Sequence, residues 1–217
     1  MAESGPPDKF VRANTAVAAA PLVPEIRLHL ATEITPLWHA TEASLARDQL
    51  PPPYWAFAWA GGQALARHIL DHPELVRGRR VLDFGAGSGL VAVAAAKAGG
   101  RVTAAEIDPF AQAAIRLNAG LNGVDVAIES ADVIDLGPVP WEVVLAGDMC
   151  YERPLAERLT AWLRTLAAQG VDVLLGDPGR AYLPAAGLVA LARYTVQTTL
   201  ELEDRVSREG VVWRMAP

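Results

Sequence analysis

From about residue 80 onward, the chain alternates short apolar runs with longer segments rich in alanine and leucine. The apolar runs predict strands at residues 80–85, 101–106, 124–130, 142–148, 171–177, 194–202 and 210–216. The longer segments predict helices at residues 90–99, 109–123 and 155–170, with a shorter helix at about 184–193. Strands and helices that alternate in this way are typical of a mostly parallel sheet covered by helices. The last two strands are close enough in sequence to pair antiparallel, so we expect a seven-stranded α/β sandwich.

The N-terminal third lacks this regular alternation. Between residues 23 and 49 we expect one or two short helices, followed by a stiff connector at residues 50–55, where three prolines fix φ and remove backbone donors. A helix follows from about Gly62 to Asp71. A chain of 217 residues fits a single domain. We expect residues 1–20 to be a mobile arm, because they are mostly small and polar, and residues 61–217 to be the α/β core.

Three glycines directly follow the first predicted strand of the core. Gly85, Gly87 and Gly89 mark a turn into a helix, where missing side chains let backbone N–H groups approach a ligand. Glu106 ends the next strand, about 20 residues further on, which suits a carboxylate that binds ribose hydroxyls. A glycine turn alone can be purely structural, but with Asp83 before it and Glu106 after it the pattern indicates a nucleotide site.

The spacing of the glycines favours one nucleotide class over another. It is G-x-G-x-G and not the G-x-G-x-x-G of dinucleotide sites, and the last two strands predict an antiparallel pair. Both features favour S-adenosylmethionine. The segments VLDFGAGSG and AAEIDP resemble the first two motifs of the class I, seven-stranded methyltransferases.

That resemblance implies a fold and a set of cofactor contacts. The implied strand order is 3-2-1-4-5-7-6, with the last strand antiparallel. Asp83 and the glycine backbone would lie near the amino-acid end of the cofactor, Glu106 on the ribose and Asp132 near the adenine amine. Each has an alternative: Asp83 could only orient the glycine turn, and Asp132 could belong to an ordinary polar loop. Asp108, before Pro109, is expected to cap a helix.

Four further segments resemble a narrower family, the electron transfer flavoprotein β-subunit lysine methyltransferases. They are VPEIRLHL, PYWAFAWAGGQALARHIL, GDMCYE and VLLGDPGR, and the similarity runs from about Pro24 to the C-terminus. The resemblance implies a protein-lysine N-methyltransferase whose substrate is that β-subunit. Residues 21–60 would then cover the cofactor site. Trp59 would contact the cofactor, and Gln63 would bind either its carboxylate or a neighbouring backbone group.

In the related lysine methyltransferases, an acidic residue and an aromatic three positions later form part of the reaction centre. Here they are Asp148 and Tyr151, at the end of the fourth core strand. The family's aromatic at Cys150 is absent, so Cys150 is expected to be a buried packing residue. Asp177 and Arg180 follow the fifth strand, either as a lip of the substrate pocket or as a structural turn.

Methyl transfer to an amine sets an electrostatic requirement. A lysine with a pKa near 10.4 is charged at neutral pH, and deprotonation costs roughly 4 to 5 kcal/mol. A carboxylate at position 148 attracts and orients the ammonium but also raises its pKa, so desolvation by aromatic walls must oppose it. We expect Tyr151, Trp55 and Trp59 to supply those walls and cation–π contacts.

Composition bears on the partners, the location and the metal content of the protein. The formal net charge of -6 and the pI near 5.2 argue against a nucleic-acid-coating surface. One cysteine, no convincing signal peptide and no long uncharged apolar run favour the cytoplasm, away from membranes. We also expect a monomer. The four histidines have no metal-ligand spacing, so no metal is expected. A ribosomal protein or small amine as acceptor, an NAD-linked oxidoreductase and a regulatory nucleotide-binding module stay open as alternatives.

Overall fold

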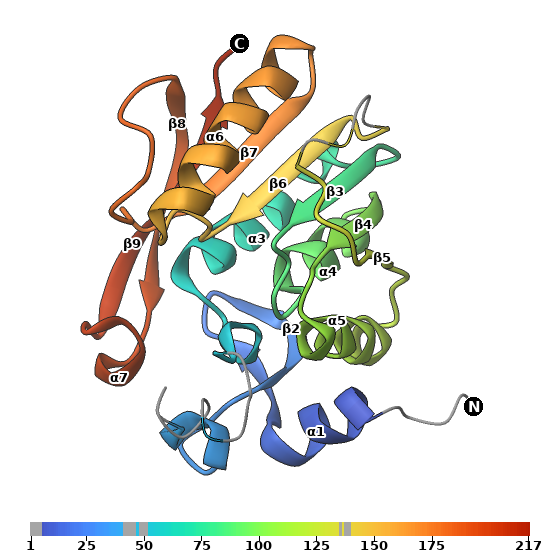
Figure 1. Cartoon of the computed structure of the whole chain (residues 1–217), viewed down its shortest axis with the longest axis vertical. Coiled ribbons are helices and arrows are strands. Elements are labelled where there is room, and N and C mark those ends of the chain that lie inside the picture. Colours follow the sequence, from blue (N-terminus) through green and yellow to red (C-terminus); the bar gives the residue numbers. More distant parts are fainter. Residues whose placement is uncertain (1–5, 41–46, 48–51, 135, 137–139) are drawn as a thin grey trace.

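A seven-stranded sheet forms the centre of the computed structural model, which describes residues 6–40, 47, 52–134, 136 and 140–217 (Figure 1). The strands are β3 (Arg80–Phe84), β4 (Arg101–Ala105), β5 (Ala127–Glu129), β6 (Val143–Gly147), β7 (Asp172–Asp177), β8 (Leu188–Gln197) and β9 (Ser207–Met215). Their order is β5-β4-β3-β6-β7-β9-β8. The first five run parallel, and β9 is antiparallel to both β7 and β8. The predicted strand order is therefore confirmed.

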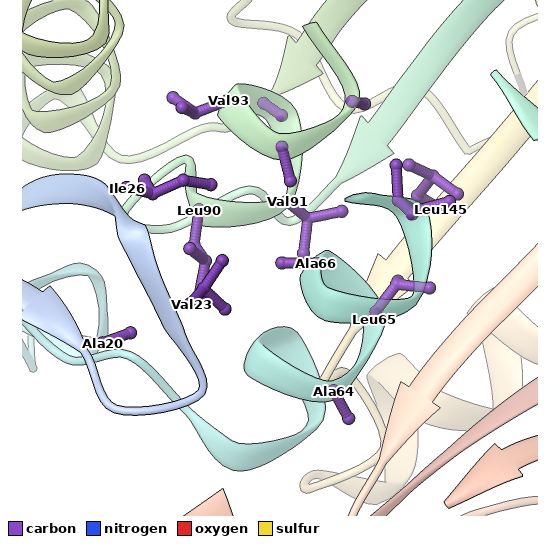
Figure 2. Close-up of a cluster of buried hydrophobic side chains, with 14 of the residues drawn as sticks. Ala20, Val23, Ile26, Ala64, Leu65, Ala66, Leu90, Val91, Val93 and Leu145 are labelled. Carbon is purple, nitrogen blue, oxygen red and sulfur yellow. The ribbon is translucent and has the colours of Figure 1, made fainter. Parts of the chain in front are cut away.

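Helices cover both faces of the sheet. They are α3 (Ala60–Asp71), α4 (Leu90–Lys97), α5 (Pro109–Asn122) and α6 (Arg153–Ala168). Along β6 the side chains alternate between two cores: Val143 and Leu145 pack with α3 and α4, whereas Val144 and Ala146 pack with α6. Figure 2 shows the first of these cores, in which Leu145 lies beside residues of α3 and α4.

The expectation of a mobile N-terminal arm is wrong for residues 6–20. These residues form α1 (Pro6–Asn14) and β1 (Ala16–Ala20). Helix α1 packs on α5, where the rings of Phe10 and Phe110 are 4.8 Å apart and Asp8 pairs with Arg116 at 2.9 Å. These contacts give a short polar segment the tertiary partners that its composition does not reveal.

The prediction of one or two short helices within residues 23–49 is also wrong for the first residues of this segment. Val23–Leu30 forms β2, an antiparallel partner of β1. Ile26, Leu28 and Leu30 are buried at every second position, which is the period of a strand, and His29 between the last two is buried as well. Two short 3₁₀ helices, η1 (Pro36–His39) and η2 (Tyr54–Ala56), follow, and η3 (Pro73–Leu75) comes after α3. The predicted proline connector lies partly outside the described residues.

In the C-terminal hairpin, the helix and strand boundaries differ from those predicted. The helix predicted at residues 184–193 is absent. Residues 188–197 instead form β8, which pairs with β9 along nearly the whole length of both strands. The expected strand at 194–202 ends early, and α7 (Leu200–Glu203) follows it, with Thr199 capping its first turn. This short helix lies at the tip of the hairpin (Figure 1). In the described part of the chain, no helix is both long and apolar enough to cross a membrane.

Candidate active site at the carboxyl ends of the strands

A cavity of about 330 Å³ opens where the parallel strands end. This is the edge of open α/β sheets at which ligands bind. Nine of the residues predicted for the site line the cavity: Trp55, Trp59, Gly85, Gly87, Glu106, Asp132, Asp148, Tyr151 and Arg180. Four others, Gln63, Asp83, Gly89 and Asp177, are not part of its lining.

The glycine turn between β3 and α4 depends on left-handed backbone conformations. Gly85 and Gly87 have φ of 62° and 51°, which side-chain-bearing residues rarely adopt. A Cβ at Gly85 would lie 2.5 Å from the Met149 sulfur, so the turn also has no room for one. Glu106 holds this turn in place, since its carboxylate accepts hydrogen bonds from the N–H groups of Gly87 at 3.0 Å and Asp108 at 3.1 Å. Burial raises the pKa of Glu106.

Asp83 and Gly89 support the turn from beneath. The Asp83 side chain is 1% exposed and accepts a hydrogen bond from the Ala92 N–H, in the first turn of α4, at 2.8 Å. Burial raises the pKa of Asp83 to about 8. Gly89, with φ of 76°, is the N-cap residue of α4 and lies against Ile115. These contacts match the alternative in which Asp83 orients the glycine turn.

Gln63 and Asp132 already have protein partners. The Gln63 amide accepts from the Leu22 N–H at 3.2 Å and donates to the Ala58 carbonyl at 2.6 Å, so it binds neighbouring backbone, the second of its two expected roles. Asp132 accepts from the Ile134 N–H at 3.0 Å and pairs with Arg158 at 2.6 Å. Asp132 still borders the cavity, whereas Gln63 does not.

Asp148 follows β6 in an unusual backbone conformation. Its φ is 62°, a region that aspartate visits more readily than most residues and that often marks functional sites. The side chain is 5% exposed. One carboxylate oxygen accepts from the Gly61 N–H at 2.7 Å, and the other accepts a short hydrogen bond from Arg180 Nε. Burial raises the pKa of Asp148, while Arg180 acts in the opposite direction.

Arg180 reaches the cavity from the turn after β7. The buried Asp177 carboxylate accepts from the N–H groups of Gly179 and Arg180, both at 2.7 Å, and so builds the turn. Burial raises the pKa of Asp177 to about 6. The structural alternative therefore describes the contacts of Asp177, and the cavity residue is Arg180. Its guanidinium lies 5.7 Å from the Trp59 ring centre and donates to Glu203 in α7.

Aromatic rings form one wall of the cavity. Tyr54 lies 5.6 Å from Tyr151 and 6.2 Å from Trp59 between ring centres, and Trp55 is 3% exposed. Tyr54 was not among the residues predicted for the site, although it adjoins Trp55 in a segment already assigned to it. Glu203 was not predicted either, because the sequence of its segment predicted a strand and gave no local signal for a site.

Cys150 lies in the core and is not part of the cavity lining. Cys150 is 1% exposed within the core beneath α6, and burial raises the pKa of its thiol to about 12. The thiolate that would act as a nucleophile is therefore disfavoured. Over the described residues, no group of three or more His, Cys, Asp or Glu side chains is placed to hold a metal ion.

Two solved structures that align with this chain are methyltransferases. Magnesium protoporphyrin IX methyltransferase from Synechocystis PCC 6803, with bound SAM, aligns with a TM-score of 0.53 at 16% identity, over 72% of this chain and 80% of that one. A ribosomal protein L11 methylase from Lactobacillus delbrueckii subsp. bulgaricus aligns with a TM-score of 0.51 at 20% identity, over 74% and 81% of the two chains. The chain therefore has the class I methyltransferase fold.

Sequence similarity defines the family more narrowly. The ribosomal protein L11 methyltransferase (PrmA) family matches residues 64–150. The electron transfer flavoprotein beta subunit lysine methyltransferase of Xenopus laevis is 38% identical over 97% of this chain and 87% of its own length. The human protein of the same name is 37% identical over 96% and 81%. At this identity over nearly its whole length, the chain belongs to the electron transfer flavoprotein beta subunit lysine methyltransferase family.

Proposed function

We propose that the protein transfers methyl groups from S-adenosylmethionine to lysine side chains of the electron transfer flavoprotein β-subunit. The observation that carries this proposal is the 38% identity to a protein of that name over 97% of the chain. The cavity at the strand ends supports it, because it joins a glycine turn to a carboxylate, a guanidinium and aromatic rings.

The residues of the cavity fit the cofactor. Gly85 and Gly87 line the cavity, and neither has a Cβ that would separate its backbone from a ligand. A carboxylate has about four acceptor positions, and Glu106 uses two of them for backbone N–H groups. We assign the remaining capacity to ribose hydroxyls. When bound, S-adenosylmethionine supplies an electrophilic methyl group on a sulfonium.

The residues of the chain would place the lysine and keep water from it. We assign Asp148 to orienting the incoming ammonium, because it lines the cavity with its backbone N–H bonded to the Gly176 carbonyl and its carboxylate held by the Gly61 N–H. Tyr151, Tyr54 and Trp59 would enclose the side chain, and their faces attract an ammonium by about 0.5 to 2 kcal/mol each. Correct orientation of amine and methyl group supplies much of the rate enhancement in such a displacement.

A second acceptor class has a specific observation in its favour. A ribosomal protein L11 methyltransferase of Pseudomonas aeruginosa (strain LESB58) is 43% identical to this chain, but over 43% of the chain and 33% of its own length. The matching family profile ends at Cys150 and so covers the glycine turn, Glu106 and Asp148. This similarity supports a shared use of the cofactor, and a ribosomal protein as acceptor is the alternative that the assay must address.

The proposal is tested by mass spectrometry of the electron transfer flavoprotein β-subunit after incubation with the protein and S-adenosylmethionine. We expect lysine residues to gain methyl groups in increments of 14 Da, and Asp148→Asn serves as the inactive control. Ribosomal protein L11 is assayed in parallel. Methylation of L11 without methylation of the β-subunit would overturn the proposed substrate, whereas cofactor binding with no transfer to either would overturn the proposed activity.

We further propose that the protein acts as a monomer in the cytoplasm and binds neither nucleic acid nor membranes. The support is the acidic balance of the chain and its single cysteine. Light scattering coupled to size exclusion tests the monomer, and fractionation of cells that express the tagged protein tests the location.

A further inference from the structure

Four alternating charges extend from the cavity into the C-terminal hairpin. Asp148 accepts from Arg180 Nε, and the two terminal nitrogens of Arg180 donate to the Glu203 carboxylate at 2.9 and 2.7 Å. Arg208 Nε lies 2.9 Å from Glu203 Oε2, one of the two oxygens that also accept from Arg180. We call these residues the charge chain. Because carboxylates and guanidinium groups alternate, its charges balance.

Burial makes this balance important. The side chains of Asp148 and Glu203 are 5% and 1% exposed, and that of Arg180 is 17% exposed. Charges in such surroundings are poorly screened by water, so each strongly affects its neighbours. Burial alone would lower the pKa of Arg180, but its hydrogen bonds to Asp148 and Glu203 raise it, so Arg180 stays charged.

The position of Arg180 bears on the proton of the substrate amine. Arg180 borders the cavity and lies over Trp59, and it shares the Asp148 carboxylate that would orient a lysine. An unpaired carboxylate raises the pKa of a nearby amine, whereas a guanidinium lowers it. An amine at Asp148 therefore meets a carboxylate whose charge is already offset.

The other titratable groups around Asp148 do not replace Arg180. Asp177 approaches from the end of β7, and Cys150 and Tyr151 follow in sequence. Tyr54 faces Tyr151 from the segment before α3, and Glu106 approaches from the end of β4. All five are acids, phenols or thiols. They add no positive charge to the cavity.

We propose that Arg180 offsets the charge of Asp148 so that the substrate ammonium can release its proton to water before methyl transfer, with Glu203 as the positioning residue that holds Arg180. This inference rests on the proposed lysine methylation. In this proposal Asp148 orients the amine, and Arg180 prevents Asp148 from raising the pKa of that amine. Glu203, at the tip of the hairpin, would then take part in the reaction, although it lies outside the glycine turn and the strand ends.

The test is the pH dependence of kcat with saturating electron transfer flavoprotein β-subunit, because kcat reports ionisations within the enzyme–substrate complex. In Arg180→Gln we expect the midpoint of the rising limb to move up by about one pH unit or more, so that activity recovers in alkaline solution. Arg180→Lys keeps the positive charge and should return the midpoint toward that of the unaltered protein. The double variant Arg180→Gln/Glu203→Gln removes one charge of each sign, so the charge chain stays neutral overall while Asp148 still loses Arg180, and it should show the same upward shift.

Two further variants separate this role from structural damage. Glu203→Gln leaves the charge on Arg180, so we expect a lower kcat without an upward shift of the midpoint. Arg193→Gln breaks a pair with Glu209 at 2.6 Å on the same hairpin, where both side chains are more than half exposed. Its pH profile should overlay that of the unaltered protein.

A kcat that falls by the same factor at every pH in Arg180→Gln and in the double variant would overturn the role of Arg180. That result leaves the proposed function intact, since the unaltered protein would still methylate lysine. Failure of the unaltered protein to transfer any methyl group is the separate outcome that overturns the proposed function.

Discussion

Two neighbouring glycines in α3 should respond oppositely to the same substitution. Gly61 packs against Gly176 in β7, and a Cβ there would lie less than 3.0 Å from the Gly176 carbonyl oxygen and 2.8 Å from its carbon. At Gly62 the nearest atom to an added Cβ is a Val91 methyl at 4.0 Å. Gly61→Ala therefore forces backbone apart, whereas Gly62→Ala fits without displacement.

The expected magnitudes follow from these contacts. Alanine is favoured over glycine in a helix by about 0.5 to 1 kcal/mol, and this gain applies to both variants. Overpacking typically costs about 1 to 3 kcal/mol, and it applies to Gly61→Ala alone. The two variants should thus differ in the free energy of unfolding by about 1 to 3 kcal/mol. For a protein of this length the difference in Tm is about 2 to 12 °C.

Calorimetry of both variants and the unaltered protein measures the effect. Gly62→Ala should melt at or above the unaltered Tm, and Gly61→Ala should melt below Gly62→Ala. Gly61→Ala should also lose methyl transfer, because the Gly61 N–H that binds Asp148 moves with the helix. Equal melting temperatures for the two variants, or a more stable Gly61→Ala, would refute the close approach of α3 to β7.

Three further outcomes test individual carboxylates. Asp148→Asn should lower kcat by about 100-fold or more while cofactor affinity, measured by calorimetry, stays within a few-fold. Glu106→Gln should weaken S-adenosylmethionine binding about tenfold or more, because hydrogen bonds to a charged acceptor are lost; an unchanged Kd would contradict its ribose role. Since burial raises the pKa of Asp83 to about 8 from 3.8, the folded state binds more protons between these values, and stability falls as pH rises through them. The free energy of unfolding of Asp83→Asn, measured with urea from pH 5 to 8, should fall less steeply than that of the unaltered protein.

Local patterns predicted the core of the fold well. The Gly85–Gly87 turn needs only neighbouring residues, because φ and the absence of Cβ atoms are properties of a short segment. The strand order followed from a family resemblance carried by two short motifs. The N-terminal region and the C-terminal hairpin were predicted less well. Residues 6–14 pack on α5, which lies about 100 residues further along the chain. Residues 188–197 form a strand because they pair with β9, whereas their own sequence predicted a helix up to residue 193.

The sequence by itself determined the glycine turn, Glu106 beyond it, and Asp148 and Tyr151 at one strand end, because each depends on spacing within a strand and the turn that follows. The tertiary structure alone decided which polar groups face the cavity and which are used beneath it. Asp83 and Gln63 find backbone partners, while Arg180 reaches both Asp148 and Glu203. The physical reason is that a buried charge acts on whatever lies within a few ångströms, and Glu203 becomes a neighbour of Asp148 only when the hairpin folds onto β7.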